Sequence, residues 1–324
     1  MLLAYSLVDG ALKAQTVPHD RDVPADALWL DLVSPAHLED KQIERAVGVE
    51  IPTREEMRQI EPSSRLYVEA GAAYMTLSIL CGADTEAPSV NPVTFILVKG
   101  KLVTVRYADP KPFSVLAGRL GKLCTQTTGG QILMELLDTI VDRVSEVLER
   151  AGTDIERLSK RVFERDTEGG NRTQRYRAIL THIGRKEGLL SYARESLASL
   201  SRLLAFIGTE GDSKPLGPDT KSQIKSMTRD VAGLSDYANF LGNKLQFLLD
   251  GTIGMVGLEQ NNIIKIFAVL SVVLMPPTLI ASIYGMNFQH MPELAETYGY
   301  PIALTAMVVS AILPYLFFKW RRWL

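Results

Sequence analysis

The chain has 324 residues, of which 46% are hydrophobic and 22% charged, and its formal net charge is −2. This composition is typical of a folded protein of roughly two domains, and it excludes a disordered chain and a strongly basic nucleic-acid-binding protein. The two cysteines, Cys81 and Cys124, form no CxxC motif, so we expect reduced thiols rather than a disulfide or a zinc site.

The sequence has no glycine-rich phosphate loop, nucleophile elbow or HExxH motif. We therefore expect no enzyme active site and no organic cofactor. The N-terminal segment MLLAYSLVDG has neither a basic start nor a long apolar core, which is not typical of a cleaved signal peptide. The part of the chain that precedes the first long apolar run is expected to stay in the cytoplasm.

Residues 1–125 are predicted to form a cytoplasmic α/β domain. Strand-like stretches occur at 28–33, 72–80 and 93–107, the last with a turn at Lys99-Gly100-Lys101. A helix is predicted to begin in the segment SPAHLEDKQIERAVG, with Ser34 as its N-cap and Pro35 in its first turn.

Residues 126–215 are predicted to form a cytoplasmic helical hairpin. Two amphipathic stretches, at 130–165 and 172–208, are separated by DTEGGN, whose glycines predict a turn. Acidic and basic side chains alternate along the first stretch, as on a solvated helix face.

Residues 216–286 are predicted to form one very long helix. No proline occurs between Pro218 and Pro276, apolar residues recur at helical spacing, and Asp219 or Thr220 is a candidate N-cap. The intrinsic helicity is lowered by Gly233, Gly242, Gly251, Gly254 and Gly257, so such a helix must be stabilised by packing. The alternative is two shorter helices with a break between Gly251 and Gly257.

Two apolar runs near the C-terminus predict membrane spans. No Asp, Glu, Lys or Arg occurs at 266–292 or at 297–318, and each run exceeds the roughly 20 residues that cross a bilayer. We predict spans at about 263–286 and at 298–318, an external loop at 287–297 and a basic tail at 319–324. Since the loop has no Lys or Arg, both termini are expected to be cytoplasmic in the inner (plasma) membrane. The alternative is a buried helical hairpin in a soluble core.

Small and polar side chains share one face of the first predicted span. Steps of three and four residues define a stripe of Asn261, Ile264, Ala268, Ser271, Met275, Thr278 and Ser282. Such a stripe is compatible with tight helix packing. It is also compatible with the lining of a narrow pore, in which Met275 is an apolar constriction. Because one chain has two spans, a pore requires an oligomer.

The segment between the spans carries a family resemblance. Tyr284-Gly285-Met286-Asn287 is followed by Met291-Pro292-Glu293-Leu294, after a first span and before a second one that ends in a basic tail. This arrangement resembles the CorA family of divalent-cation channels, for which the GMN triplet and the MPEL loop are a signature. The resemblance implies an α+β membrane protein with the architecture above, a homopentamer around the first span, and transport of Mg²⁺, with passage of Co²⁺ and Ni²⁺.

The resemblance places an ion-selectivity filter at Gly285, Met286 and Asn287. Mg²⁺ sheds its water reluctantly, and a ring of neutral Asn287 amides could hydrogen-bond to the hydrated ion. Glu293 and Glu296 are expected to attract cations from outside. The alternatives are a helix C-cap for Asn287 and simple loop solvation for the two glutamates.

The resemblance also implies a regulatory role for cytoplasmic Mg²⁺, bound by carboxylates between subunits. Asp230 on the long helix and Asp84 with Glu86 in the segment CGADTEAP are the candidates, and Asp236 and Asp250 are alternatives. Arginines nearly balance the acidic residues of the hairpin, so extensive Mg²⁺ binding there is not expected.

Three functions are compatible with the sequence. The favoured one is a Mg²⁺ uptake channel gated by cytoplasmic Mg²⁺. The second is a transporter of zinc or another transition metal on the same scaffold, for which the loop offers only His290 as a ligand. The third is a membrane-anchored sensor that conducts nothing, although an anchor would not need the polar stripe.

Overall fold

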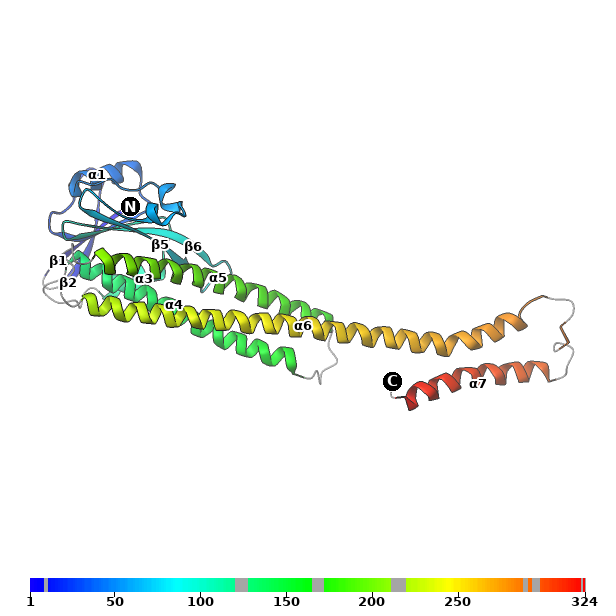
Figure 1. The fold of residues 1–324 in the computed structure, drawn as a ribbon. Coiled ribbons are helices and arrows are strands. Elements are labelled where there is room, and N and C mark those ends of the chain that lie inside the picture. The colour runs from blue at the N-terminus through cyan, green and yellow to red at the C-terminus, as the bar shows by residue number, and fades with distance from the viewer. Residues whose placement is uncertain are drawn as a thin grey trace. The chain divides into compact units, whose positions relative to one another are not determined.

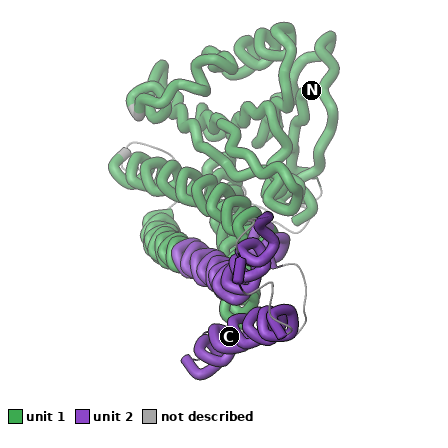
Figure 2. The backbone as a smooth tube through the Cα atoms, turned by 90° about the vertical axis from the view of Figure 1, so that its right-hand side faces the viewer, with its two compact units in different colours: residues 1–169, 178–248 green, residues 170–177, 249–324 purple. Residues whose placement is uncertain are grey.

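The structure is a computed structural model that describes residues 1–8, 11–119, 128–164, 172–210, 220–287, 291–292, 298–321 and 323. The chain divides into two compact units (Figure 2). Unit 1 comprises Met1–Gly169 and Ala178–Leu248, and unit 2 comprises Gly170–Arg177 and Leu249–Leu324. Unit 1 therefore holds the sheet and most of the helical hairpin, whereas unit 2 holds the end of the long helix and the last helix.

Unit 1 is built on a seven-stranded sheet in the order β2-β1-β3-β7-β6-β5-β4 (Figure 1). The strands are β1 (Leu2–Val8), β2 (Ala11–Val17), β3 (Ala27–Val33), β4 (Leu66–Glu69), β5 (Ala72–Cys81), β6 (Ser89–Val98) and β7 (Lys101–Arg106). β3 and β7 run parallel, and the other neighbours are antiparallel. The predicted strands are confirmed as β3, β5, β6 and β7, while β1, β2 and β4 are additional.

The predicted turn between β6 and β7 is confirmed as a two-residue hairpin. Lys99 and Gly100 have φ values of 49° and 78°. Positive φ at both central residues is the geometry of a type I′ turn, whose twist matches that of the flanking strands. The Lys99 ammonium also donates a hydrogen bond to the Val47 carbonyl oxygen at 3.1 Å.

Helix α1 (His37–Val47) begins later than predicted, and the predicted cap is wrong. Its N-cap is Ala36, whose backbone N–H donates to the Glu39 carboxylate at 2.9 Å. Ser34 instead has φ 43°, and its backbone N–H donates to the Arg106 carbonyl oxygen at 2.7 Å. The end of the parallel β3–β7 pair therefore fixes Ser34, and a carboxylate three residues beyond Ala36 caps the helix.

The two faces of the sheet pack against different helices. One face forms a core with α1 and the short helix η1 (Glu56–Arg58), in which Ile43 and Met57 are almost fully buried. On the other face, Trp29 and Phe95 lie against Phe113 of α3 (Lys111–Arg119). The long helix α4 contacts this second face at β3, β6 and β7. A further short helix, α2 (Pro62–Arg65), leads into β4.

The predicted hairpin consists of α4 (Gly129–Phe163) and α5 (Arg172–Glu210). Thr128 and Gln131 form a reciprocal capping box at the start of α4. Helix α5 covers a part of β5 that the short β4 leaves open, and there Ser199 Oγ accepts a hydrogen bond from the Ser78 backbone N–H at 3.0 Å. The predicted DTEGGN turn lies outside the described residues.

The predicted long helix is confirmed as α6 (Thr220–Tyr284), which is unbroken through its glycines. The alternative with a break between Gly251 and Gly257 is therefore wrong. In unit 1, α6 runs beside α4 and α5 (Figure 1), and its buried residues recur at helical spacing: Ile224, Met227, Val231, Ala238, Leu241, Leu245 and Leu248.

In the described part of the chain, two helices are long and apolar enough to cross a membrane, and unit 2 contains both apolar segments: the second half of α6 and α7 (Gly299–Trp320). Only 6% of the most apolar window of α6 and none of that of α7 is buried within the chain. A buried hairpin in a soluble core would hide these side chains from solvent. Their exposure disfavours that alternative and fits surfaces that face lipid or other copies of the chain.

Candidate functional site

The candidate site begins where α6 ends. The helix ends at Tyr284, and the Gly285 backbone N–H still donates to the Ala281 carbonyl oxygen at 2.9 Å. A Cβ atom at Gly285 would lie 3.0 Å from that oxygen, which is closer than nearly all real Cβ contacts. Met286 N–H then bonds to the Ile283 carbonyl oxygen at 3.3 Å, which tightens the last turn. Glycine at position 285 thus lets the chain leave the helix without crowding its last carbonyls.

The three residues of the GMN triplet are consecutive and exposed at this helix end. Met286 has 46% of its surface exposed, and Asn287 is also exposed. An exposed amide can present its oxygen to a hydrated ion or to a neighbouring chain. The predicted cation-attracting residues Glu293 and Glu296, and His290, lie outside the described residues.

The polar stripe lies on a free face of α6. All seven predicted members are exposed, with Ile264 at 64% and Met275 at 67%. The residues of this part of α6 with reduced exposure occupy another face: Val269, Val273, Pro276, Pro277 and Ile280. At 3.6 residues per turn, the centre of the stripe lies roughly 155° around the helix axis from that face.

Helix α7 has a matching face of reduced exposure, formed by Ala303, Met307, Ser310, Ala311, Pro314 and Phe318. The reduced exposure of one face on each helix indicates that these two faces are turned toward each other, and Figure 1 shows α7 running alongside the end of α6. Val269 and Ala303 are the most buried members, at 5% and 9% exposure. The contact with α7 therefore uses one side of α6 and leaves the polar stripe uncovered within the chain.

The hydroxyl groups of the stripe are oriented by their own helix. Ser271 Oγ donates to the Phe267 carbonyl oxygen at 2.9 Å, and Thr278 Oγ1 donates to the Leu274 carbonyl oxygen at 2.7 Å. Each hydroxyl proton is therefore used inside the helix, whereas the oxygen lone pairs remain free to accept. Acceptors suit a hydrated cation, because the water molecules around a cation point their hydrogen atoms outward.

Two consecutive prolines, Pro276 and Pro277, lie inside α6. Neither has a backbone N–H, so the carbonyl groups of Val272 and Val273, four residues earlier, lose their helical donors. In a sequence, a pair of prolines within an apolar helix indicates carbonyl groups that lack helical hydrogen-bond donors. In a membrane span, such carbonyls need another partner or mark a bend.

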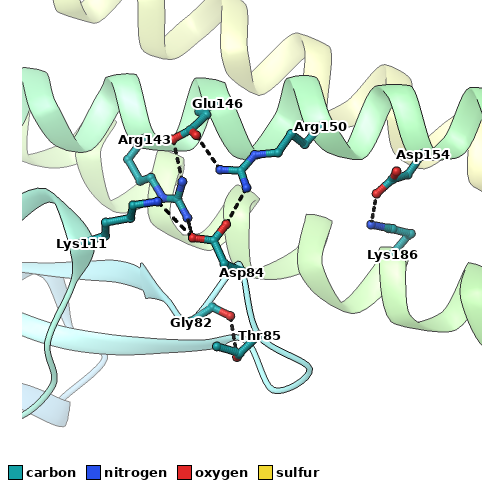
Figure 3. Close-up of polar contacts among 9 residues, drawn as sticks. All are labelled: Gly82, Asp84, Thr85, Lys111, Arg143, Glu146, Arg150, Asp154 and Lys186. Atoms are coloured by element: carbon teal, nitrogen blue, oxygen red, sulfur yellow. Dashed lines mark hydrogen bonds and ion pairs between the residues drawn. The ribbon is translucent and has the colours of Figure 1, made fainter.

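Asp84, predicted as a regulatory metal ligand, lies at the centre of an ion-pair network in unit 1 (Figure 3). One carboxylate oxygen accepts from Arg150 at 2.5 Å, and the other accepts from Arg143 at 2.6 Å and from Lys111 at 3.2 Å. Glu146 bonds to both arginines, at 2.6 and 2.7 Å. These contacts join the β5–β6 loop to α3 and α4.

The network sets the charge of Asp84. Burial raises the pKa of this carboxyl, but the hydrogen bonds and positive charges of Lys111, Arg150 and Arg143 outweigh burial and lower the pKa to about 2. Both oxygens are thus charged and already in contact with cations. A Mg²⁺ ion at Asp84 would have to displace at least one of these groups. The role of Asp84 as a metal ligand stays a prediction, and in the single chain it holds a loop.

Asp230, the other regulatory candidate, is exposed on α6 and lines a different cavity. Glu135 and Asp138 of α4 line the same cavity of about 260 Å³. Burial raises the pKa of Asp138, and the negative charges of Asp142 and Asp230 raise it further. Within one chain the structure does not bring Asp230 together with Asp84 or Glu86. Among the described residues, no group of three or more His, Cys, Asp or Glu side chains could hold a metal ion.

These features define a membrane protein with a large N-terminal α/β and helical part and two C-terminal apolar helices, the first of which carries an uncovered polar stripe. The chain belongs to the CorA family: residues 24–321 match the family described as CorA-like Mg²⁺ transporter protein. This membership confirms the resemblance inferred from the GMN triplet.

Relatives and solved structures agree with this assignment. The chain is 32% identical over 326 residues to the magnesium transport protein CorA of Yersinia pseudotuberculosis and 30% identical over 328 residues to that of Pasteurella multocida, with full coverage of both chains in each case. The fold resembles that of the CorA magnesium transporter from Methanocaldococcus jannaschii, with a TM-score of 0.73 and 17% identity over 98% of this chain and 97% of that one.

Two other structures share the fold at lower sequence identity. The full-length CmaX protein has a TM-score of 0.69 and 13% identity over 99% of this chain and 97% of that one. The ZntB cytoplasmic domain from Vibrio parahaemolyticus has a TM-score of 0.58 and 9% identity over 79% of this chain and 97% of that one. The scaffold is therefore shared with proteins of other names, and the fold alone does not identify the transported ion.

Proposed function

We propose that this protein is a channel for Mg²⁺ uptake. The observation that carries the proposal is the polar stripe of α6, which is exposed on the side away from α7 and leads to Gly285, Met286 and Asn287 at the helix end. The full-length relatives named magnesium transport protein support Mg²⁺ as the ion. On the same scaffold, Co²⁺ and Ni²⁺ are expected to pass as well, since they too are small hydrated divalent cations.

The proposed channel is a homopentamer around α6. One chain offers one stripe, which cannot enclose a conduit, so several copies must place their stripes around a common axis. In this arrangement Asn261, Ser271 and Thr278 contact water, and Met275 forms an apolar constriction. Ile264, Ala268 and Ser282 complete the lining. The uncovered stripe leaves room for these contacts without displacing α7.

The proposed filter is a ring of Asn287 amide oxygens, with Gly285 and Met286 shaping the backbone around it. Mg²⁺ holds its water tightly, so a pore that binds the hydrated ion avoids the cost of stripping it. Neutral oxygens accept hydrogen bonds from the ion's water and still release the ion, as conduction requires. In the proposed loop, Glu293 and Glu296 raise the local cation concentration.

The proposed topology places both termini in the cytoplasm of the inner (plasma) membrane. The domains are then the cytoplasmic α/β domain (1–125), the hairpin (126–215), the long helix with the first span (216–286), the external loop (287–297), the second span (298–318) and the basic tail (319–324). Cytoplasmic Mg²⁺ acts as regulatory ion at Asp230, with Asp84 and Glu86 of a neighbouring subunit as further candidate ligands.

The test is ion flux into liposomes that contain the purified protein. We expect Asn287→Ala to lower Mg²⁺ flux by about tenfold or more, because the hydrated ion loses its hydrogen-bond acceptors at the narrow entrance. The matched control is Asn262→Ala, which removes an exposed amide on the same helix outside the stripe. Mg²⁺ flux at the wild-type rate through Asn287→Ala, with intact assembly, would show that Asn287 is only a helix cap.

The second candidate is a transporter of zinc or another transition metal, since the fold, which the ZntB cytoplasmic domain shares, does not by itself identify the ion. It is the weaker candidate, since that likeness is 9% in sequence and excludes the spans, whereas the magnesium transport relatives match along their full length. The same liposomes distinguish the two: rapid Zn²⁺ uptake without Mg²⁺ uptake would replace the first proposal by the second.

A further inference from the structure

A groove in unit 1 lies between the β5–β6 loop and helices α4 and α5. It consists of two adjoining cavities of about 430 and 270 Å³ that share His182 and Lys186 as lining residues. The larger one is bounded by Thr85, Glu86 and Pro88 of the loop. Cavities of this size accommodate small organic ligands. None of the described residues that line the groove belongs to α6.

The groove carries an excess of positive charge although the whole chain is slightly acidic. Its basic side chains are Arg157, Arg161, Arg185 and Lys186, and its acidic ones are Asp154 and Glu86. Asp154 is already shared between Lys186 at 2.5 Å and Arg157 at 3.3 Å. Arg185 is exposed at the groove, and among the described residues it has no ion-pair partner. An anionic ligand in the groove would give the Arg185 guanidinium a charged partner.

Two glycines of α5 line the larger cavity and leave the helix surface there without side chains. Gly184 and Gly188 are one helical turn apart on α5, and a Cβ atom at either position would meet nothing within 4 Å. Tyr192, one turn further on, is 36% exposed and lines the same cavity. A bare helix surface that ends at a partly exposed aromatic ring offers a flat apolar platform beside the cations. This suits a planar ring that is joined to an anionic group.

The loop that forms the opposite wall is held in place. The Asp84 network binds it to α3 and α4, and Thr85 Oγ1 closes the turn by donating to the Gly82 carbonyl oxygen at 2.8 Å (Figure 3). Figure 3 also shows Lys186 reaching Asp154 on the α4 side of the groove. Both walls are therefore ordered without a ligand, so binding would cost little conformational entropy.

We propose that this groove binds a nucleoside polyphosphate, with the phosphates at Arg185, His182 and Lys186 and the base over Gly184, Gly188 and Tyr192. At one end of the groove lie the Arg185 guanidinium, which has no ion-pair partner in the described part of the chain, and the Lys186 ammonium, which Asp154 also contacts. At the other end lies the flat apolar surface, so the two ends match the two halves of such a ligand. The site does not depend on the transported ion. It would give the protein a ligand other than the divalent cation.

The test is calorimetric titration of the full-length protein in detergent with ATP, in a buffer that contains a chelator so that Mg²⁺ does not neutralise the phosphates. We expect ATP to bind, tripolyphosphate to bind more weakly, and adenosine to bind more weakly still. Arg185→Gln should weaken ATP binding by about tenfold, through loss of a charge-assisted hydrogen bond. Gly188→Leu should weaken it similarly, because the side chain fills the floor of the cavity.

Arg45→Gln is the matched control, since it removes an exposed arginine from α1, which does not line the groove. Leucine has a higher helix propensity than glycine, so Gly188→Leu should not unfold α5. Unchanged ATP affinity in both groove variants, or no ATP binding at millimolar concentration, would overturn the proposal. Tripolyphosphate binding as tight as ATP binding would overturn the assignment to a nucleotide.

Discussion

Single carboxylates in this protein have different environments, and these decide what each can do. Asp84 is surrounded by three cations, whereas Asp230 lies beside other acidic residues at an open cavity. A carboxylate that already has cationic partners gains little from a metal ion. One that is close to like charges is stabilised when a divalent cation joins it. The two candidates for regulation should therefore respond differently to mutation.

Asp84→Asn should destabilise the protein near neutral pH. Because the pKa of Asp84 is lowered to about 2, its ion pairs contribute above its unfolded pKa of about 3.9 and are lost as the pH falls through 2. The side chain is 40% exposed, so we expect a cost of about 1 kcal/mol or less. Thermal melting in metal-free buffer measures this, with Asp26→Asn as a control at an exposed carboxylate. The difference in melting temperature between Asp84→Asn and the wild type should become smaller as the pH falls from 4 to 2.

A different result would give Asp84 its predicted metal role. If Asp84→Asn melts like the wild type without metal, but loses a stabilisation that Mg²⁺ gives to the wild type, then Asp84 is a ligand rather than an anchor of the loop.

Asp230→Ala should leave the protein folded and weaken the inhibition of flux by internal Mg²⁺. The carboxylate is exposed and close to Asp138, so its removal relieves repulsion rather than breaking an ion pair. The measurement is liposome flux against internal Mg²⁺ concentration, with Asp236→Ala as the comparison. Wild-type inhibition in Asp230→Ala would exclude Asp230 as the sensor.

At the scale of elements, two glycines at helical positions differ in the space that a Cβ atom would have. Gly129, the first residue of α4, lies so close to the β6–β7 hairpin that a Cβ atom would be 2.5 Å from the Leu102 backbone nitrogen. Its own N–H donates to the Gly100 carbonyl oxygen at 2.9 Å. Gly233, inside α6, has nothing within 4 Å of a Cβ position. The first glycine therefore allows a helix to abut a sheet, and the second only lowers helicity.

Gly129→Ala should lower the free energy of unfolding by about 1–3 kcal/mol, because the backbone of α4 or of the β6–β7 hairpin has to move to make room for the Cβ atom. Gly233→Ala should instead stabilise by about 0.5–1 kcal/mol, through the better helix propensity of alanine. Chemical unfolding of the two variants in detergent measures both. If the two variants had equal free energies of unfolding, α4 would be able to move away from the hairpin without loss of stability.

At the scale of the whole molecule, we expect the uncovered stripe to contact other copies of the chain and the exposed apolar surfaces of the spans to contact lipid. We expect native mass spectrometry of the detergent-extracted protein to give a pentamer. A stable monomer or dimer would contradict the proposed channel, because too few stripes would be present to enclose a path.

The proposed topology is tested separately. A cysteine introduced by Leu324→Cys, in a background in which Cys81 and Cys124 are replaced, should react with a membrane-impermeant thiol reagent only after the membrane is opened. Reaction in intact cells would place the C-terminus outside and reverse the proposed orientation of the loop.

The sequence by itself determined the features that depend on local pattern. Periodicity and hydropathy are properties of neighbouring residues, so the unbroken α6, the hairpin helices and the two apolar helices could all be predicted, as could the turn at Lys99 and Gly100. Three strands escaped prediction: β2 is mostly exposed and β4 has only four residues, whereas for β1, which is largely buried, no strand was predicted from the pattern. The GMN triplet gave the family, which the comparison with known proteins confirms.

Only the tertiary structure decided which distant residues meet. The parallel pairing of β3 with β7 depends on the whole sheet, and it fixes Ser34, so that Ala36 rather than Ser34 caps α1. The partners of Asp84 are 27, 59 and 66 residues away along the chain, a separation at which no local pattern indicates contact. Likewise, the face of α6 that packs on α7 is set by packing between helices. For this reason the sequence could define the polar stripe, whereas the structure was needed to find that α7 leaves it uncovered.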